Sequence, residues 1–437
     1  MRVTMTMRPG ARMRTAAAAS VPQSMRAARL RRYLGRYSRW KMAEHGPVRA
    51  IAEGGIDSTM VEAWLSMVEC DALKEKIVRE RGRASSAATL DLSRGEEECA
   101  KVMREAAFGG TGFFYLKGHG IPRETLDGVM RSHSWFFEQE AELKNTFRPT
   151  TKFHEPLGYK DAQVENILVE KESQTKPDFR EHLRVARKRY QYDFHKETGV
   201  DTSVLDAHNI SEMDGDHLHW VGQEDAGGRP RPRDDDDGAL DDFKRRVEAY
   251  YSEAFKLSRK VHRITALSLG LDADAFDRYF QRPLDILMLN HYPAIKRDAA
   301  KGEVGMGAHC DFAFTTLLLT DGTEGLQVCK DKNRPVEERE WEWITPEEGT
   351  FVINFGDALE RLTNGNYKSV LHRVANVSGR ERKSVAFFCE PSADARIKPL
   401  AMSDGDDRGA GEGEGEEVET YARYLKRRFS GISEDLQ

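Results

Sequence analysis

Residues 307–320 read GAHCDFAFTTLLLT and contain a His-x-Asp pair followed by an apolar segment. In an extended strand successive side chains point to opposite faces, so His309 and Asp311 share one face and can meet a common metal ion. Cys310 then points to the other face, and we interpret it as a packing residue. The pair alone is a weak signal, because His and Asp also occur together at strand ends as hydrogen-bonded partners.

Residues further along the chain strengthen this signal. His372 lies on a later β segment, and Arg382 follows it by ten positions. Two imidazoles and one carboxylate can hold one face of an octahedral Fe(II) ion and leave three coordination positions open. A guanidinium downstream can clamp an anionic co-substrate. Because chance rarely supplies all four residues, the set predicts a non-haem iron oxygenase.

The pattern around these residues is that of short β-strands separated by Gly, Asp and Asn turns. Seven or eight such strands predict a sandwich or jelly roll. The expected strands span 286–289, 315–319, 326–328, 341–344, 350–354, 370–374 and 384–389. Further expected elements are strands at 89–93 and 113–116 and helices at 96–108, 123–142, 243–270 and 418–429. The predicted fold class is therefore α+β, mainly β, with flanking helices.

Composition excludes several classes of protein. The 437 residues carry 39% hydrophobic side chains and a net charge of -6, with no apolar run long enough to span a membrane. An acidic balance favours a small-molecule substrate over nucleic acid, and we expect a monomer with no membrane partner. Five cysteines without a C-x-x-C pair predict neither a disulfide framework nor a zinc ribbon. A reducing compartment follows, so we expect a cytoplasmic protein.

The N-terminus leaves that location open. Residues 1–43 contain ten Arg and one Lys, and no acidic residue precedes Glu44. Such an Arg-rich, acid-poor composition is typical of a transit peptide for a mitochondrion or chloroplast. It does not fit a secretory signal, because no apolar segment follows the charges. The alternatives are a disordered basic tail or an over-extended start, with Met25 or Met42 as the true initiator.

Four other signals are weaker. His217 and His219 form a His-x-His pair that could bind metal, but no third ligand stands at a sensible spacing. The acidic run 234–237 is typical of a solvated loop, and the Gly/Glu-rich segment 409–417 of a flexible linker. Residues 44–82 show helical spacing and predict a helix of unknown partner.

A resemblance to a known family is carried by several stretches. They are LNHYP (289–293), AHCD (308–311), GLQV (325–328), NFGD (354–357), LTNGNYKSVLHRV (362–374) and RKSVAFF (382–388). Together they resemble the catalytic half of the isopenicillin N synthase-like branch of the Fe(II)/2-oxoglutarate-dependent oxygenases. Residues 89–150 are similar to the N-terminal region of that family, including GFF (112–114) and GHGI (118–121).

The resemblance implies a double-stranded β-helix core and a set of site residues. Iron would be bound by His309, Asp311 and His372, which are also the expected catalytic residues. Arg382 and Ser384 would take the distal carboxylate of 2-oxoglutarate. The further residues implied are Tyr292 and Asn290, which would help to hold this co-substrate, and His119, which would be a structural histidine of its turn.

The implied reaction hydroxylates or desaturates a small-molecule metabolite while 2-oxoglutarate and O2 become succinate and CO2. The implied cofactors are therefore Fe(II), 2-oxoglutarate and O2, with ascorbate as a further candidate. One alternative is an iron-dependent oxidase of the same family that uses no 2-oxoglutarate. Another is a non-catalytic, ligand-binding jelly roll, which would normally have lost a ligand residue.

The expected organisation of the chain has six parts. They are a basic or transit-like segment (1–43), a helical extension (44–88), an N-terminal oxygenase region with an insert-like stretch (89–240), a long helix (241–284), the catalytic jelly roll (285–400), and an acidic linker with a final helix (401–437). The substrate has no readable signature. Phe314, Phe388 and the aromatics near Tyr190 and Tyr192 suggest an apolar or aromatic ligand, but they serve equally well as core.

Overall fold

The computed structural model describes residues 87–109, 112–149, 156–162, 178–199, 218–221, 238–294, 305–376, 378–400 and 418–433. Several expectations lie outside these residues. They concern the basic segment 1–43, the helix in 44–82, His217, the acidic run 234–237 and the linker segment 409–417.

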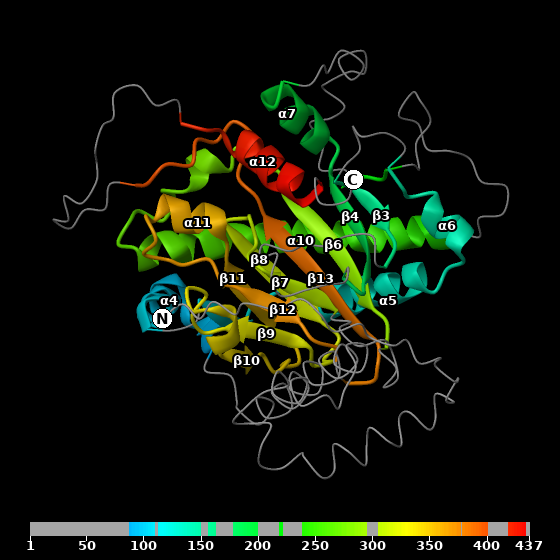
Figure 1. The fold of residues 1–437 in the computed structure, drawn as a ribbon, viewed down its shortest axis with the longest axis horizontal. Helices are drawn as coiled ribbons and strands as arrows, with labels where there is room; N and C mark the ends of the chain where they lie inside the picture. The colour runs from blue at the N-terminus through cyan, green and yellow to red at the C-terminus, as the bar shows by residue number, and fades with distance from the viewer. Residues whose placement is uncertain are drawn as a thin grey trace, which may run out of the picture. The chain divides into compact units, whose positions relative to one another are not determined.

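Two β-sheets dominate the described part of the chain (Figure 1). The larger has the order β1 (Ala88–Asp91), β2 (Phe113–Lys117), β11 (Phe351–Phe355), β8 (Thr315–Thr320), β13 (Arg382–Cys389), β6 (Ile286–Tyr292), β4 (Glu181–Arg187) and β3 (Gly158–Lys160), and β5 (Leu218–His219) also pairs with β4. The smaller has the order β10 (Trp341–Trp343), β9 (Leu326–Cys329), β12 (His372–Val374) and β7 (Met306–His309).

The two sheets pack face to face through an apolar cluster. Phe113 and Val352 of the larger sheet are buried together with Leu326 and Val328 of the smaller one. Inner faces that interdigitate in this way form the core of a sandwich. The arrangement is the one expected of a jelly roll with flanking helices.

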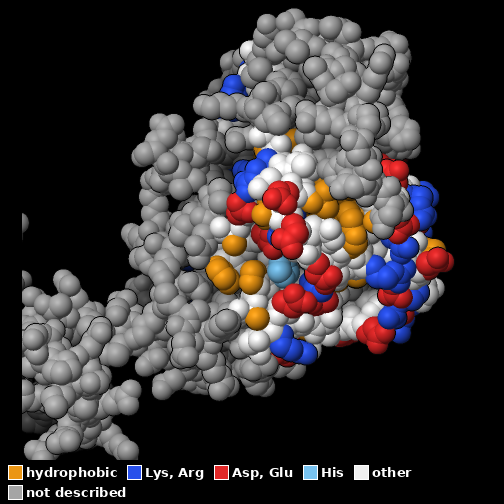
Figure 2. Space-filling view, turned by 90° about the vertical axis from the view of Figure 1, so that its right-hand side faces the viewer, with side chains coloured by type: hydrophobic (Ala, Val, Ile, Leu, Met, Phe, Trp, Pro, Cys, Tyr) orange, Lys and Arg blue, Asp and Glu red, His pale blue; other side chains and the backbone are white. Residues whose placement is uncertain are grey.

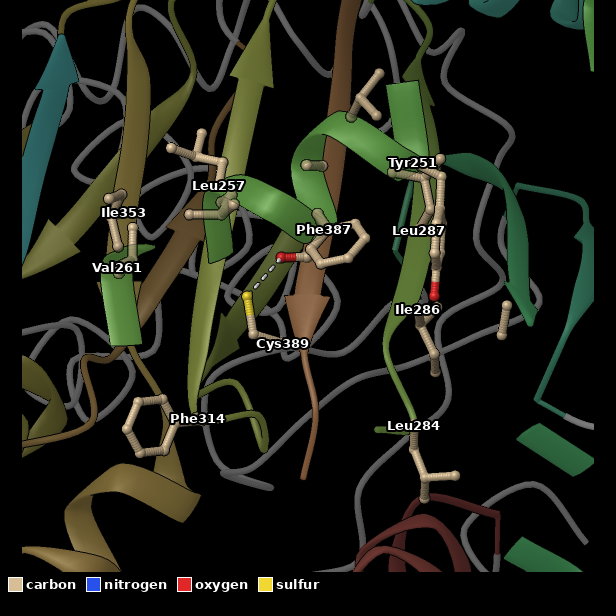
Figure 3. Close-up of a cluster of buried hydrophobic side chains, with 14 of the residues drawn as sticks. Tyr251, Leu257, Val261, Leu284, Ile286, Leu287, Phe314, Ile353, Phe387 and Cys389 are labelled. Atoms are coloured by element: carbon tan, nitrogen blue, oxygen red, sulfur yellow. Dashed lines mark hydrogen bonds between the residues drawn. The ribbon is translucent and has the colours of Figure 1, made fainter. Parts of the chain in front are cut away.

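A long helix covers the outer face of the larger sheet. This helix, α10 (Ala239–Ser268), places Tyr251, Leu257 and Val261 over Phe387 and its neighbouring apolar side chains on the strands (Figure 3). Burial of each large apolar side chain contributes about 1.5–3 kcal/mol relative to exposure, so this layer is a major source of stability. Two further helices, α4 (Glu96–Gly109) and α5 (Arg123–Phe137), pack against α10.

Helix boundaries differ from expectation mainly after α5. A single helix was expected over 123–142, but α5 ends at Phe137 and a separate helix, α6 (Ala141–Asn145), follows. The physical reason lies at the junction: the Gln139 side chain donates to the carbonyl of Trp135 at 2.7 Å, while Glu140 adopts an extended ψ of 154°. A side chain that satisfies a terminal carbonyl ends a helix in this way.

The remaining helices are short. They are α7 (Arg189–Glu197), α11 (Asp357–Leu362), α12 (Tyr421–Ser433) and the 3-10 helices Leu92–Arg94, Asp277–Tyr279 and Val336–Glu338. None of the helices in the described ranges combines the length and the apolar character that a membrane crossing requires. On the face shown in Figure 2, acidic and basic side chains are interspersed, so neither sign dominates its described part.

Strand alternation sends polar side chains of the larger sheet toward the smaller one. On β6, Leu287 and Leu289 face the helical layer, whereas Met288, Asn290 and Tyr292 face the space between the sheets. The antiparallel register with β13 puts Arg382 opposite Tyr292 and Ser384 opposite Asn290. The polar residues that were expected to form a site are thereby brought to one interior face.

Candidate metal and co-substrate site

Three buried side chains converge between the sheets at the ends of β7 and β12. His309, Asp311 and His372 each offer a ligand atom, and these atoms all lie within 4.8 Å of one another. Oδ1 of Asp311 is 3.5 Å from Nε2 of His309 and 3.7 Å from Nε2 of His372. One carboxylate oxygen and two imidazole nitrogens therefore face a common point.

Backbone carbonyls determine which nitrogen of each imidazole is available. Nδ1 of His309 lies 2.9 Å from the carbonyl oxygen of Gly307, and Nδ1 of His372 lies 3.0 Å from that of Val370. A carbonyl can only accept, so both Nδ1 atoms carry a hydrogen, and in the neutral rings both Nε2 atoms present a lone pair. Burial, followed by the neighbouring imidazole of His309, lowers the pKa of His372 to about 4, which keeps this ring neutral at physiological pH.

Two side chains from neighbouring strands hold the carboxylate of Asp311. Its Oδ2 accepts hydrogen bonds from Thr316 Oγ1 at 2.6 Å and from Asn354 Nδ2 at 2.7 Å. Burial would raise the pKa of this carboxyl, but His372, His309 and the hydrogen bond from Asn354 hold the pKa well below its usual range. Asp311 is thus ionised, with Oδ1 left for a metal ion as the two hydrogen bonds occupy Oδ2.

Arg382 lies on β13, with its side chain almost fully buried. Its guanidinium stacks 5.1 Å from the ring centroid of Tyr292, and NH1 lies 3.4 Å from Ser384 Oγ. Its Nε has no hydrogen-bond partner among the described residues. The stem passes close to Gly325, where an added Cβ would stand only 2.8 Å from Cδ of Arg382. A buried guanidinium with a donor to spare fits an anionic ligand.

All seven expected site residues line a single cavity. Its polar wall consists of Asn290, Tyr292, His309, Asp311, His372, Arg382 and Ser384, joined by Arg180, Thr316 and Asn354. Its apolar wall consists of Phe113, Met288, Met306, Leu318, Leu326, Val374, Ala386 and Phe388. The metal-facing residues and the buried guanidinium therefore line the same cavity.

Three of these polar residues were missed by sequence reasoning. Asn354 belongs to the NFGD stretch and Thr316 to an expected strand, so alternation along those strands could have placed both. Arg180 lies in a stretch whose sequence has no regular pattern. Its place in the site depends on the pairing of β4 with β6, residues about a hundred positions apart.

Other residues considered from the sequence lie away from this cavity. His119 accepts from the backbone N–H of Ile121 through Nδ1, and its Nε2 lies 3.2 Å from the carbonyl of Gly349. Cys310 is buried among apolar side chains of the smaller sheet. Phe314 packs against Phe276 and other rings of the helical layer, so of the two Phe suggested as ligand contacts only Phe388 lines the cavity.

Comparison with known proteins identifies relatives over most of this region. Residues 283–391 match the 2OG-Fe(II) oxygenase superfamily, and residues 87–201 match the family described as non-haem dioxygenase in morphine synthesis N-terminal. Azadirone synthase LFS of Melia azedarach is 31% identical, over 71% of this chain and 83% of its own length. Clavatol oxidase claD of Penicillium crustosum is 30% identical, over 73% of this chain and 86% of its own length.

Solved structures agree with these matches. A full-length Neurospora crassa protein in complex with alpha-KG superposes with a TM-score of 0.59 at 26% identity, covering 78% of this chain and 95% of that chain. JOX2 in complex with 2OG, Fe and JA superposes with a TM-score of 0.53 at 26% identity, covering 73% of this chain and 78% of that chain. The predicted jelly-roll class is confirmed by these superpositions.

Proposed function

The chain belongs to the 2OG-Fe(II) oxygenase superfamily, and on that premise we propose that His309, Asp311 and His372 bind iron while Arg382 binds 2-oxoglutarate. The protein is an Fe(II)- and 2-oxoglutarate-dependent dioxygenase that oxidises a small-molecule metabolite. The cofactors expected from the sequence, Fe(II), 2-oxoglutarate and O2, are confirmed by this membership. When bound, they supply the oxidising chemistry by converting 2-oxoglutarate and O2 to succinate and CO2.

The donor set supports the iron assignment. Two Nε2 lone pairs and one carboxylate oxygen are the ligands of a facial triad, which suits Fe(II) and leaves positions for other ligands. The hydrogen bonds at both Nδ1 atoms and at Oδ2 of Asp311 orient the three side chains before any ion arrives. Ligands held by such outer partners bind a metal without further reorganisation.

Arg382 would bind the distal carboxylate of 2-oxoglutarate, helped by Ser384. Stacking on Tyr292 fixes the plane of the guanidinium, and a fixed plane favours paired hydrogen bonds to a carboxylate. Asn290 and Tyr292 would complete the pocket for this co-substrate from β6. The observation that carries the proposal is that the three ligand residues and the buried Arg382 line one cavity.

The protein's own contribution to the reaction is orientation and exclusion of water. The apolar wall, with Phe113, Leu318 and Phe388, keeps solvent from the face of the triad. We propose that the same wall receives an apolar part of the substrate. One relative is named as a synthase of azadirone and another as an oxidase of clavatol, which supports a metabolite rather than a macromolecule as the substrate.

For the whole protein we propose a monomer in the cytoplasm that binds neither nucleic acid nor membrane. The proposal depends on the acidic composition and the few cysteines. Import into an organelle is the alternative, carried by the arginine-rich segment 1–43. Size-exclusion chromatography tests the first statement. Microscopy of the full-length chain with a C-terminal fluorescent fusion separates the two locations.

An anaerobic titration tests the proposed function directly. Fe(II) is added first and 2-oxoglutarate second, and chelation of the keto acid is followed by the visible absorption of its Fe(II) complex. We expect one equivalent of each to bind. Release of succinate is then measured with a collection of metabolites, and the substrate is the compound that stimulates it. A protein that binds iron but shows no interaction with 2-oxoglutarate would contradict the co-substrate assignment.

A further inference from the structure

Arg180 is a second guanidinium at the cavity that contains the triad and Arg382. It immediately precedes β4, and its side chain is 1% exposed. In the antiparallel register Glu181 lies opposite His291, which puts Arg180 at the level of Tyr292 on the adjacent strand. Two strand spacings, on the order of 10 Å, separate it from Arg382 on the far side of β6.

Arg180 makes a short polar contact with Asn290. NH1 of Arg180 lies 2.5 Å from Oδ1 of Asn290 and 3.2 Å from Sδ of Met288. A guanidinium can only donate, so the amide atom that faces it must be the oxygen and not the nitrogen. Arg180 therefore determines which way the Asn290 amide is turned.

The turned amide presents its other end to the site. Nδ2 of Asn290 donates to no group of the described residues, and Asn290 lines the cavity. The backbone of this residue is held as well, because its carbonyl oxygen lies 2.8 Å from Nε2 of the buried His133. Asn290 thus offers an oriented N–H donor on the same face as the triad.

Arg180 is itself anchored to the strand that carries an iron ligand. Its Nε lies 3.7 Å from Oδ2 of Asp178, and Oδ1 of Asp178 accepts the backbone N–H of Gly307 at 2.9 Å. The carbonyl of Gly307 is the acceptor for His309. One chain of polar contacts therefore runs from the imidazole of His309 to the amide of Asn290.

We propose that Arg180 is a positioning residue for the co-substrate: it orients Asn290 so that Nδ2 donates a hydrogen bond to 2-oxoglutarate. The inference rests on the proposed function, because it takes 2-oxoglutarate as the ligand of Asn290. Arg180 acts through Asn290 and does not touch the co-substrate. Without its guanidinium the amide can turn over and present an oxygen, which repels a carboxylate.

The test compares Arg180→Met, Asn290→Leu and the double variant in the full-length, iron-loaded protein. We expect Arg180→Met to raise the dissociation constant of 2-oxoglutarate about tenfold, the loss typical of one hydrogen bond to a charged group. The double variant should bind no more weakly than Asn290→Leu alone, since Arg180 has nothing left to orient. Arg180→Lys keeps a donor and should restore most of the affinity.

The matched control is Arg184→Met, which removes a buried arginine that lies within β4 itself. Its NH1 donates to the carbonyl of Pro156 at 3.3 Å, and it does not line the cavity. We expect both 2-oxoglutarate affinity and Fe(II) affinity to be unchanged in this control. In Arg180→Met the fall in 2-oxoglutarate affinity should exceed any fall in Fe(II) affinity measured without 2-oxoglutarate. Circular dichroism verifies that each variant is folded.

Two results would overturn the inference. One is an unchanged dissociation constant in Arg180→Met. The other is additive losses in the double variant, which would mean that Arg180 contacts 2-oxoglutarate itself. A wild-type protein that fails to bind 2-oxoglutarate would instead overturn the proposed function, before any variant is compared.

Discussion

His372 lies directly opposite His309 in the antiparallel pairing of β12 with β7, and the centroids of their rings are 4.2 Å apart. Two residues far apart in the chain thus become cross-strand neighbours. Because each ring has its Nδ1 hydrogen bonded to a carbonyl, both direct Nε2 toward Asp311. The metal site is therefore built across a strand pair.

Replacing His372 by Ala should abolish turnover and stoichiometric Fe(II) binding while the fold persists. The reason is that one of three ligands is lost, whereas the ring contributes little to the apolar core. Anaerobic Fe(II) titration measures the loss. His119→Ala serves as control, because that histidine lies away from the cavity and should leave iron binding intact. Undiminished iron binding by the His372 variant would contradict the assignment.

Replacing Arg382 by Lys should raise the 2-oxoglutarate concentration needed for half-maximal turnover by about tenfold or more, because an ammonium lacks the planar fork. Succinate release at varied 2-oxoglutarate measures it. The control is Lys383→Ala: the ammonium of Lys383 contacts Ser134 Oγ at 2.9 Å on the other side of the strand. Equal effects of the two substitutions would argue against a carboxylate site at Arg382.

Removing either donor to Asp311 should weaken iron binding. Asn354→Leu and Thr316→Val each leave Oδ2 with one hydrogen bond fewer, and loss of such an outer partner typically costs about 10- to 100-fold in metal affinity. Competition with a metal chelator measures the change. Thr315→Val is the matched control, since the adjacent Thr315 does not line the cavity. If Thr315→Val weakened iron binding as much, the effect would be general destabilisation.

The buried His133 should make the iron-free protein less stable in mild acid. Burial lowers the pKa of this ring to about 3 in the folded state, against roughly 6.5 in the unfolded chain. Between these values the unfolded state binds more protons, so the free energy of unfolding falls as pH drops below about 6.5, by up to roughly 1.4 kcal/mol per pH unit.

His133→Gln tests this prediction because the amide retains a donor for the Asn290 carbonyl but does not titrate. Urea unfolding of both proteins between about pH 7 and pH 5 gives the comparison. Any stability advantage of the wild type should shrink as the pH falls. A difference that stays constant over this range would show that His133 does not take up a proton on unfolding.

The jelly roll could be predicted because period-two alternation and turn residues are local signals, and His309 and Asp311 lie within one such stretch. The break between α5 and α6 depends on where the Gln139 side chain finds a partner, which spacing alone does not encode. Phe314 and Phe388 have the same chemistry, yet one packs under α10 and the other lines the cavity. Phe314 precedes β8 and Phe388 lies on β13, so their different surroundings depend on how these segments pack, which is a long-range property.

Arg180 illustrates the same limit within the site. Its partner Asn290 is 110 positions away, and the contact exists only because β4 pairs with β6. An arginine in a charged stretch is usually solvated, so its sequence context favours the surface. Burial at the cavity reverses that expectation, and the hydrogen bond to Asn290 gives the physical reason.

The position of β7 at the border of the smaller sheet also bears on how the protein unfolds. This strand pairs only with β12 in the described part of the sheet, so few backbone hydrogen bonds fasten it. An ion bound by both His309 and His372 would cross-link the two strands. Iron would then protect this border from fraying, with a gain that grows as the free ion concentration exceeds its dissociation constant. The metal centre would in this way stabilise the pairing of β7 with β12 in addition to its role in the reaction.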